Sequence, residues 1–167
     1  MAMHIAGFEL NYEHGALELF VSGCTRNCEG CHNPELQKYG VGKKWQRWLR
    51  ENTYRLSHEY SLLVDKIWVM GGDILCQQPE DTFEFLKALR KVAPSMQIIV
   101  WTGASSVKEV DIDIIEFVDG FKFGAYDKNL EDPDYVAGYI APSKHIIDMH
   151  LASRNQFFIF TGEHVYG

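Results

Sequence analysis

The sequence has no long apolar segment and few cysteines. No uncharged apolar run reaches the roughly 18 residues that a membrane-spanning helix needs, and the N-terminal segment lacks the basic start of a signal peptide. Only four of the 167 residues are cysteine, and three of these lie within eight positions, which argues against a disulfide framework. We therefore expect a cytoplasmic protein with reduced thiols and no membrane contact.

Positive charge is also scarce. The formal net charge is −7, which excludes a nucleic-acid-binding protein that depends mainly on electrostatic attraction. The charge is unevenly distributed, because residues 38 to 55 contain six basic residues and one acidic residue. The simpler interpretation of this basic segment is a solvated face. The alternative is a docking patch for a protein partner or a phosphate.

The sequence contains neither internal repeats nor low-complexity tracts or linkers. Hydrophobic residues make up 46% of the chain and aromatic residues 13%, which is typical of a folded globular protein. The length suits one domain over residues 1–167 with a core of its own.

Strand-like and helix-like segments alternate along the chain. Strands are predicted at Ala16–Ser22, 64–70, Gln97–Trp101, 117–123, 144–149 and Phe157–Phe160, with 3–9 as a candidate additional edge strand. Helices are predicted at 43–59, Pro79–Val92 and 106–116. Such alternation is typical of βα units with a mostly parallel sheet. Only five or six strands are expected to fit, too few to close an eight-stranded barrel. The predicted fold class is therefore α/β, an open partial (β/α) barrel of about five or six mostly parallel strands.

The most informative motif is the spacing of Cys24, Cys28 and Cys31 in a segment rich in Gly, Asn and Pro. A [4Fe–4S] cluster normally takes four cysteine ligands. Three thiolates would leave one iron open, so that the cluster can take part in chemistry as well as carry electrons. We predict that these three cysteines are the metal ligands and the catalytic residues.

Two other interpretations of the cysteines remain open. A structural zinc site needs a fourth ligand, but neighbouring residues such as Cys31 and His32 rarely reach one tetrahedron, and no later pair of ligands follows. A helical stripe of buried thiols conflicts with the turn residues between the cysteines. Cys76 is interpreted as a small buried hydrophobic residue rather than a fourth ligand.

Further candidate residues follow two other predicted strands. Gly71, Gly72 and Asp73 follow one strand and Thr102 follows the next, just as the cysteine segment follows Ala16–Ser22. Because ligands bind beyond the carboxyl ends of parallel strands, these segments should meet at one pocket.

Each of these residues has a chemical role that fits a ligand site. The two glycines allow a ligand close to the main chain, and Asp73 can hold an ammonium group. Thr102 can bind a carboxylate or a ribose, with a plain turn as the alternative. The backbone of His32 and Asn33 is expected to contact the base of a ligand.

Together these motifs resemble the radical S-adenosylmethionine superfamily, and within it the activating enzymes of anaerobic ribonucleoside-triphosphate reductase. The resemblance covers residues 16 to 149. It rests on Gly23-Cys-x3-Cys-x-Gly-Cys-His-Asn, on Gly71-Gly72-Asp73 and on Trp101-Thr102-Gly103, with additional similarity at Asp119-Gly120-Phe121 and 143–148. Gly30, His32 and Asn33 are typical of enzymes that activate glycyl-radical proteins.

The resemblance implies an oxidoreductase that binds a [4Fe–4S] cluster through the three cysteines. It also implies that S-adenosylmethionine is bound with the help of Gly30, His32, Asn33, Gly71, Gly72, Asp73 and Thr102. Reductive cleavage of S-adenosylmethionine would then generate a glycyl radical on the partner, the large subunit of anaerobic ribonucleoside-triphosphate reductase. A flavodoxin-like or ferredoxin-like protein is the implied electron donor.

Two alternatives for the function remain. Ile74 stands where these enzymes usually have Pro, and Lys144 follows Ser143 directly, which favours a radical S-adenosylmethionine enzyme acting on a small molecule such as a pterin in deazapurine synthesis. The other alternative is a non-enzymatic iron–sulfur or zinc module.

Overall fold

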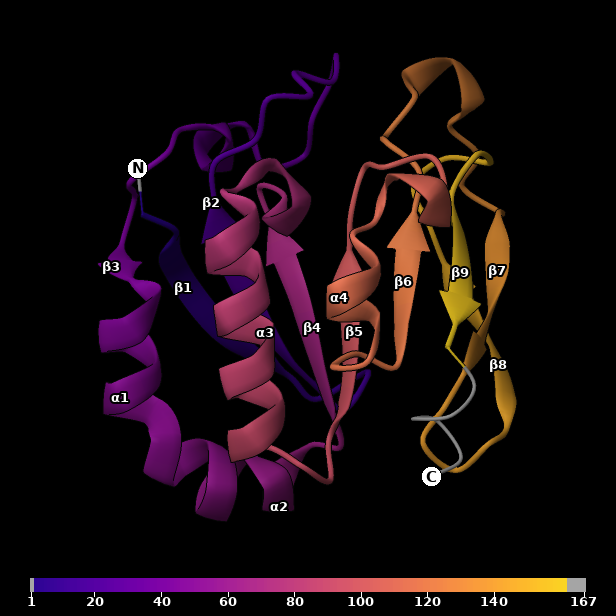
Figure 1. The fold of residues 1–167 in the computed structure, drawn as a ribbon. Helices are drawn as coiled ribbons and strands as arrows, with labels where there is room; N and C mark the ends of the chain where they lie inside the picture. Colours follow the sequence, from indigo (N-terminus) through magenta and orange to yellow (C-terminus); the bar gives the residue numbers. More distant parts are fainter. Residues whose placement is uncertain (1, 162–167) are drawn as a thin grey trace.

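A seven-stranded sheet forms the centre of the protein. The computed structural model describes residues 2–161, and the strand order in the sheet is β3-β1-β2-β4-β5-β6-β9 (Figure 1). The strands are β1 (His4–Asn11), β2 (Ala16–Ser22), β3 (Lys43–Lys44), β4 (Lys66–Gly71), β5 (Gln97–Trp101), β6 (Gly120–Phe123) and β9 (Phe157–Phe160). Strands β2, β4, β5 and β6 are parallel, whereas β1, β3 and β9 pair antiparallel with their neighbours. The fold is therefore α/β with a mixed sheet whose central strands are parallel.

Helices cover one face of this sheet (Figure 1). They are α1 (Trp45–Arg55), which continues through a π-helical turn (Leu56–Tyr60) into α2 (Ser61–Leu63), then α3 (Pro79–Val92) and the short α4 (Ile112–Ile115). Their buried side chains pack against alternate residues of the central strands, such as Leu19, Val69 and Val100, in one hydrophobic core. Burial of this apolar surface is the main force that holds the helices to the sheet.

A hairpin of β7 (Val136–Ile140) and β8 (Ile146–His150) packs on the opposite face. Trp68 and Ile99 point to this side because side chains alternate along a strand, and they form a second core with Tyr139 and Phe158. The Trp68 indole donates a 3.0 Å hydrogen bond to the Tyr139 hydroxyl, which donates to Gln97 at 2.6 Å. These buried polar contacts join the hairpin to β4 and β5.

The number of strands differs from the sequence-based expectation. Over residues 2–161 the central sheet has seven strands and the hairpin adds two, so the expected five or six was too low. The strand β3 has only two residues, and β7 was not predicted because Gly138 interrupts its short pattern. Within the described residues, no helix has the length and apolar character that crossing a membrane requires.

Candidate metal and cofactor site

The loops that follow β2, β4 and β5 meet at one pocket, as the sequence predicted. This pocket has a volume of about 250 Å³ and lies at the carboxyl ends of the parallel strands. Its wall contains nine of the ten candidate residues: Cys24, Cys28, Cys31, His32, Asn33, Gly71, Gly72, Asp73 and Thr102. Gly30 is not part of the wall. It has a φ of +75°, and a Cβ there would lie 3.1 Å from the Tyr126 ring.

The cysteine loop is held at its base by backbone hydrogen bonds. Gly23 donates to Leu36 at 2.8 Å, and Cys24 donates to Gln37 at 3.1 Å. All four cysteines are half-buried, and none forms a disulfide within the described part of the chain. Three reduced thiols therefore reach the pocket from one loop.

Gly71 and Gly72 are required by the close approach of β4 to the cysteine loop. Gly71 has a φ of +104°, and a Cβ there would lie 2.6 Å from the Val21 carbonyl oxygen. A Cβ on Gly72 would lie 2.5 Å from the carbonyl oxygen of Gly23. Only glycine avoids both overlaps. Gly71 therefore lets the end of β4 lie against β2, and Gly72 lets the loop after β4 approach the cysteine loop.

Asp73 connects all three loops through its buried carboxylate. One oxygen accepts hydrogen bonds from Arg26 at 2.7 Å, from the Thr102 hydroxyl at 2.9 Å and from the Gly103 amide at 2.8 Å. The other oxygen accepts from the Leu75 amide at 2.9 Å. Both oxygens thus have partners inside the protein, and the Thr102 hydroxyl donates inward rather than into the pocket. A direct contact of either residue with a ligand stays a prediction.

Lys122 is a buried site residue that the sequence analysis did not select. It lies on β6, lines the pocket and donates to the Gly124 carbonyl at 2.9 Å. Burial lowers the pKa of Lys122 to about 8, and the negative charges of Asp73 and Cys28 oppose this shift. A lysine inside the apolar strand Gly120–Phe123 was the available signal, since buried lysine is rare unless it has a partner.

Other pocket residues also came from outside the predicted motifs. Arg26, between two cysteines, forms the ion pair with Asp73, and His150 reaches the wall from the end of β8. The Trp101 indole N–H is buried and has no hydrogen-bond partner among the described residues. Such an orphaned donor beside a pocket fits a site that receives a polar ligand.

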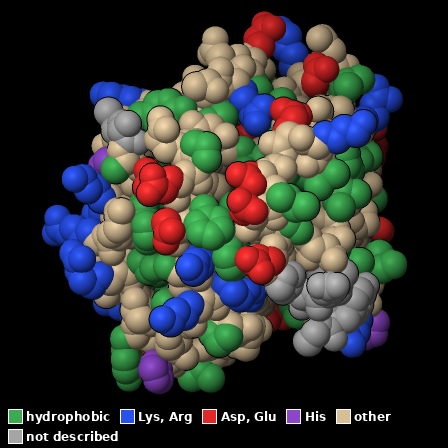
Figure 2. Space-filling model, viewed as in Figure 1, with side chains coloured by type: hydrophobic (Ala, Val, Ile, Leu, Met, Phe, Trp, Pro, Cys, Tyr) green, Lys and Arg blue, Asp and Glu red, His purple; other side chains and the backbone are tan. Residues whose placement is uncertain are grey.

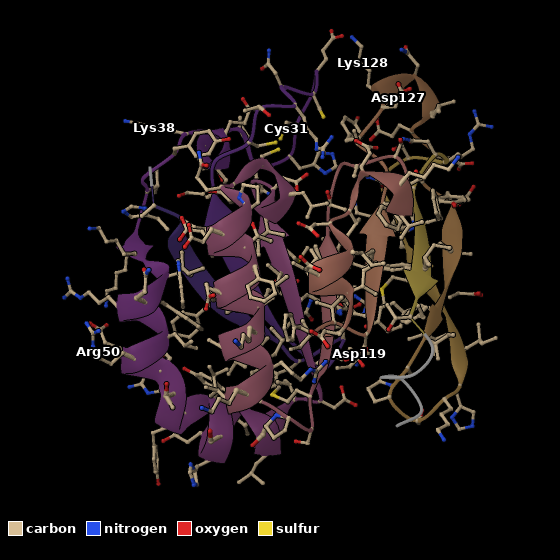
Figure 3. The ribbon with its side chains drawn as sticks, viewed as in Figure 1. Cys31, Lys38, Arg50, Asp119, Asp127 and Lys128 are labelled. Atoms are coloured by element: carbon tan, nitrogen blue, oxygen red, sulfur yellow. The ribbon has the colours of Figure 1, made fainter. Side chains whose placement is uncertain are left out.

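A second loop covers the cysteine loop on the side of β6. The rings of His32 and Tyr126 lie 4.7 Å apart, and Lys128 donates a hydrogen bond to Glu29. Figure 3 shows Cys31 and Lys128 at the same end of the molecule, whereas Asp119 lies at the far end of β6. Asp119 bonds to Arg90 there at 2.7 Å, so it has a structural role.

The expectation that Cys76 is a buried hydrophobic residue is wrong. Cys76 is half-buried, and its Sγ lies in one group with the Cys24 Sγ and a carboxylate oxygen of Asp73, all within 4.8 Å of one another. The hydrogen bond between the two thiols raises the pKa of Cys24 and lowers the pKa of Cys76.

The three motif cysteines do not form a group of this compact kind within the described residues. A single ion draws all its ligands to one centre, whereas a [4Fe–4S] cluster takes each thiolate on a different iron and needs wider spacing. The donor set of three reduced, separated thiols therefore fits a cluster better than a zinc ion.

Comparison with known proteins agrees with this chemistry. The 4Fe-4S single cluster domain family matches residues 14–138. Since this match covers most of the chain, the protein belongs to that class of iron–sulfur proteins.

Relatives with assigned names define the family further. A protein of Enterobacteria phage T4 is 30% identical over 114 residues, which cover 67% of this chain and 71% of the relative. A protein of Escherichia coli K12 is 24% identical over 121 residues, covering 71% and 79%. A protein of Haemophilus influenzae is 25% identical over 131 residues, covering 76% and 84%. Each is named an anaerobic ribonucleoside-triphosphate reductase-activating protein, and this chain belongs to the family of these activating proteins.

Proposed function

We propose that this protein cleaves S-adenosylmethionine reductively at a [4Fe–4S] cluster held by Cys24, Cys28 and Cys31. The product of this reaction would be a glycyl radical on the large subunit of an anaerobic ribonucleoside-triphosphate reductase. The observation that carries the proposal is the set of three reduced thiols from one loop at the carboxyl ends of parallel strands. Membership in the family of activating proteins supports the choice of partner.

The chemistry of such a site is supplied mainly by its cofactors. One-electron cleavage of a sulfonium bond, followed by removal of a hydrogen atom from a glycine Cα, is what a reduced cluster and S-adenosylmethionine provide when bound. The residues of this chain bind, orient and shield. Cys24, Cys28 and Cys31 would hold the cluster and would leave it one ligand short, so that a cofactor could bind there.

Several side chains are placed to hold the amino-acid part of S-adenosylmethionine. Lys122 provides a buried positive charge for a carboxylate. Gly71 and Gly72 allow the ligand to approach the main chain. The negative charge of Asp73 favours an ammonium group nearby, although its hydrogen bonds are used within the protein.

Other features complete the proposal. His32 and Asn33 line the pocket, where they would contact the nucleoside. Gly30 would assist binding indirectly, by allowing the cysteine loop to pass close to Tyr126. We infer that residues 1–167 act as one domain, that the mixed sheet forms an open partial barrel, and that the protein works in the cytoplasm. A flavodoxin-like or ferredoxin-like protein would supply the electron.

An anaerobic activation assay tests this function. Cluster-loaded, reduced protein is mixed with S-adenosylmethionine and the reductase, and the glycyl radical is measured as a doublet by electron paramagnetic resonance. We expect a doublet with the unmodified protein and none with Cys28→Ala, which removes one predicted ligand. A silent spectrum from protein with an intact, reducible cluster would reject the activase. Turnover of a small molecule without any partner would then favour the alternative substrate.

A further inference from the structure

A pair of thiols joins the proposed cluster site to a cysteine outside the motif. Cys24 lies in the loop after β2, and Cys76 ends the short 3-10 helix Ile74–Cys76 after β4. The two Sγ atoms lie within 4.8 Å of each other, in one group with a carboxylate oxygen of Asp73. The Thr25 hydroxyl also donates to the Cys76 Sγ at 3.5 Å. Cys24 therefore lies close to a thiol outside the motif.

The backbone on both sides of this pair is fixed by hydrogen bonds. The Cys24 amide donates to Gln37 at 3.1 Å, and the Cys76 amide donates to Asp73 at 3.0 Å. The Tyr39 hydroxyl donates to the Cys76 carbonyl at 2.9 Å. The two Cα atoms are thus held in place while both thiols can turn about their Cα–Cβ bonds. Such rotation is needed to reach the S–S length of about 2.05 Å.

Cys76 can also be reached from solvent by a route of its own. It lines a cleft of about 300 Å³ with Tyr39, Gln77 and Gln78, and Cys24 is not part of this wall. Cys24 lines the candidate cofactor pocket instead. A small oxidant can therefore react with Cys76 without entering the cofactor pocket.

We propose that Cys24 and Cys76 form a reversible disulfide in the cluster-free protein and that this bond controls loading of the cluster. A hydroperoxide is the oxidant: the Cys76 sulfur takes one peroxide oxygen to give a sulfenic acid, and one water leaves when the peroxide is hydrogen peroxide. The Cys24 sulfur then displaces a second water, and the S–S bond forms. Two thiols and one peroxide thus give one disulfide and two waters.

The consequence for loading rests on the proposed function. A Cys24 sulfur in a disulfide cannot bind iron, because only the thiolate is a metal ligand. Two thiolates would remain, too few to hold the cluster. A dithiol reductant restores both cysteines by thiol–disulfide exchange. The disulfide would also keep Cys24 from irreversible oxidation while no cluster is bound.

Mass mapping tests the bond directly. The full-length cluster-free protein is treated with one equivalent of hydrogen peroxide, remaining thiols are alkylated, and the digest is analysed without reduction. We expect one linked peptide pair that contains Cys24 and Cys76, is lighter by two hydrogens than the separate peptides, and disappears with dithiothreitol. Free thiols at both positions, or linkage only among Cys24, Cys28 and Cys31, would overturn the proposal.

Two variants control for the other cysteines. Cys76→Ser keeps a polar group for Thr25 and should give no such linkage. A double variant with Cys28→Ser and Cys31→Ser should still form it. Loss of the linkage in this double variant would show that it arises by exchange through the motif cysteines, contrary to the proposal.

Reconstitution with ferrous iron and sulfide tests the control of loading. We expect peroxide-treated protein to bind at least tenfold less iron than the same sample after dithiothreitol. Equal loading of the cross-linked sample would overturn the controlling role. If the fully reduced protein binds no cluster, the proposed function fails while the mass-mapping result on the disulfide still stands.

Discussion

Among the single residues of the site, Asp73 has the partners that hold the three loops together. Its buried carboxylate accepts from Arg26, Thr102, Gly103 and Leu75. We predict that Asp73→Asn lowers the free energy of unfolding by about 3 kcal/mol, because a partly buried arginine loses its counter-charge and one acceptor becomes a donor. The value is at the low end for a broken buried pair because the Arg26 side chain is 25% exposed and can reach water. Denaturant unfolding of the cluster-free protein measures the change.

A surface carboxylate provides the control for this variant. Glu51 pairs with Lys43 and Arg47 on the outside of the protein. Glu51→Gln should change the unfolding midpoint little, because exposed ion pairs contribute little to stability. Equal midpoints for the Asp73 and Glu51 variants would contradict the role assigned to Asp73.

The stability of the folded protein should depend on pH through the buried residue Lys122. Its folded pKa of about 8 lies below the ordinary value of 10.5 because the charged form is desolvated. Below pH 8 the side chain is charged in both folded and unfolded chains. Between pH 8 and pH 10.5 the unfolded chain binds more protons, so the Lys122 contribution to stability increases with pH, by up to about 3 kcal/mol. Urea unfolding of cluster-free protein at several pH values measures this slope.

The matched variant Lys122→Met separates this effect from other titrations. Methionine fills similar space without a charge, so the part of the slope due to Lys122 should vanish between pH 8 and pH 10.5. Identical pH profiles for the two proteins would show that the buried amine is not neutral in the folded state at high pH.

Among the elements of the structure, the cysteine loop is held by the loop that follows β6. Tyr126 contacts the His32 ring at 4.7 Å and lies against Gly30. We predict that Tyr126→Ala raises amide hydrogen exchange at residues 24 to 33 by about fivefold, because loss of roughly 1 kcal/mol of ring contact favours local opening. Exchange in β4 should stay unchanged. Hydrogen–deuterium exchange with mass spectrometry resolves the two segments.

Tyr54 allows a comparison with a similar contact elsewhere. It stacks on His58 at a ring distance of 4.5 Å on the outer side of α1. Tyr54→Ala should leave exchange in the cysteine loop as it is in the unmodified protein. An equal increase in both variants would mean that exchange there reports global loosening rather than loss of the His32 contact.

Some helices and strands of the fold could be predicted from the local sequence alone. Helix α3 was predicted at both ends because Pro79 suits a first helical position and Pro94 cannot continue a helix. The segment 117–123 was predicted as one strand, but only Gly120–Phe123 is extended. Phe117 instead bonds back to Ile114 at the end of α4. Tertiary packing decides where such a strand begins, and a short sequence pattern contains no information on that packing.

For the site, the order of motifs along the sequence predicted which loops meet, but it did not predict the partner of each side chain. The motifs after β2, β4 and β5 meet because parallel strands end at the same edge. The pairing of Arg26 with Asp73, and of Cys24 with Cys76, depends on residues that are 47 and 52 positions apart and on rotamers set by packing. A pattern read along one chain carries no signal for contacts of this kind.

In the whole molecule, basic residues gather on one side. Lys and Arg side chains are concentrated on the left of the view in Figure 2, over α1 and the strand before it. All six basic residues of the basic segment 38–55 are exposed: Lys38, Lys43, Lys44, Arg47, Arg50 and Arg55. This exposure fits a solvated face and a docking patch equally well, so both interpretations of the segment stay predictions. The net charge of −7 therefore falls mainly on the remaining surface.

The stability of the whole molecule should respond to S-adenosylmethionine only when a cluster is present. A ligand that binds the folded chain at 100 times its Kd adds about 2.7 kcal/mol to the free energy of unfolding. For a domain of this size that corresponds to a rise of about 5–10 °C in the unfolding midpoint. Because the open iron is the proposed anchor, the unfolding midpoint of the cluster-free protein should shift far less.

Anaerobic thermal scans with and without S-adenosylmethionine measure both shifts. S-adenosylhomocysteine is the matched ligand that lacks the sulfonium charge. An equal shift in loaded and cluster-free protein would place the binding energy in the pocket walls alone and remove the reason for a three-cysteine site.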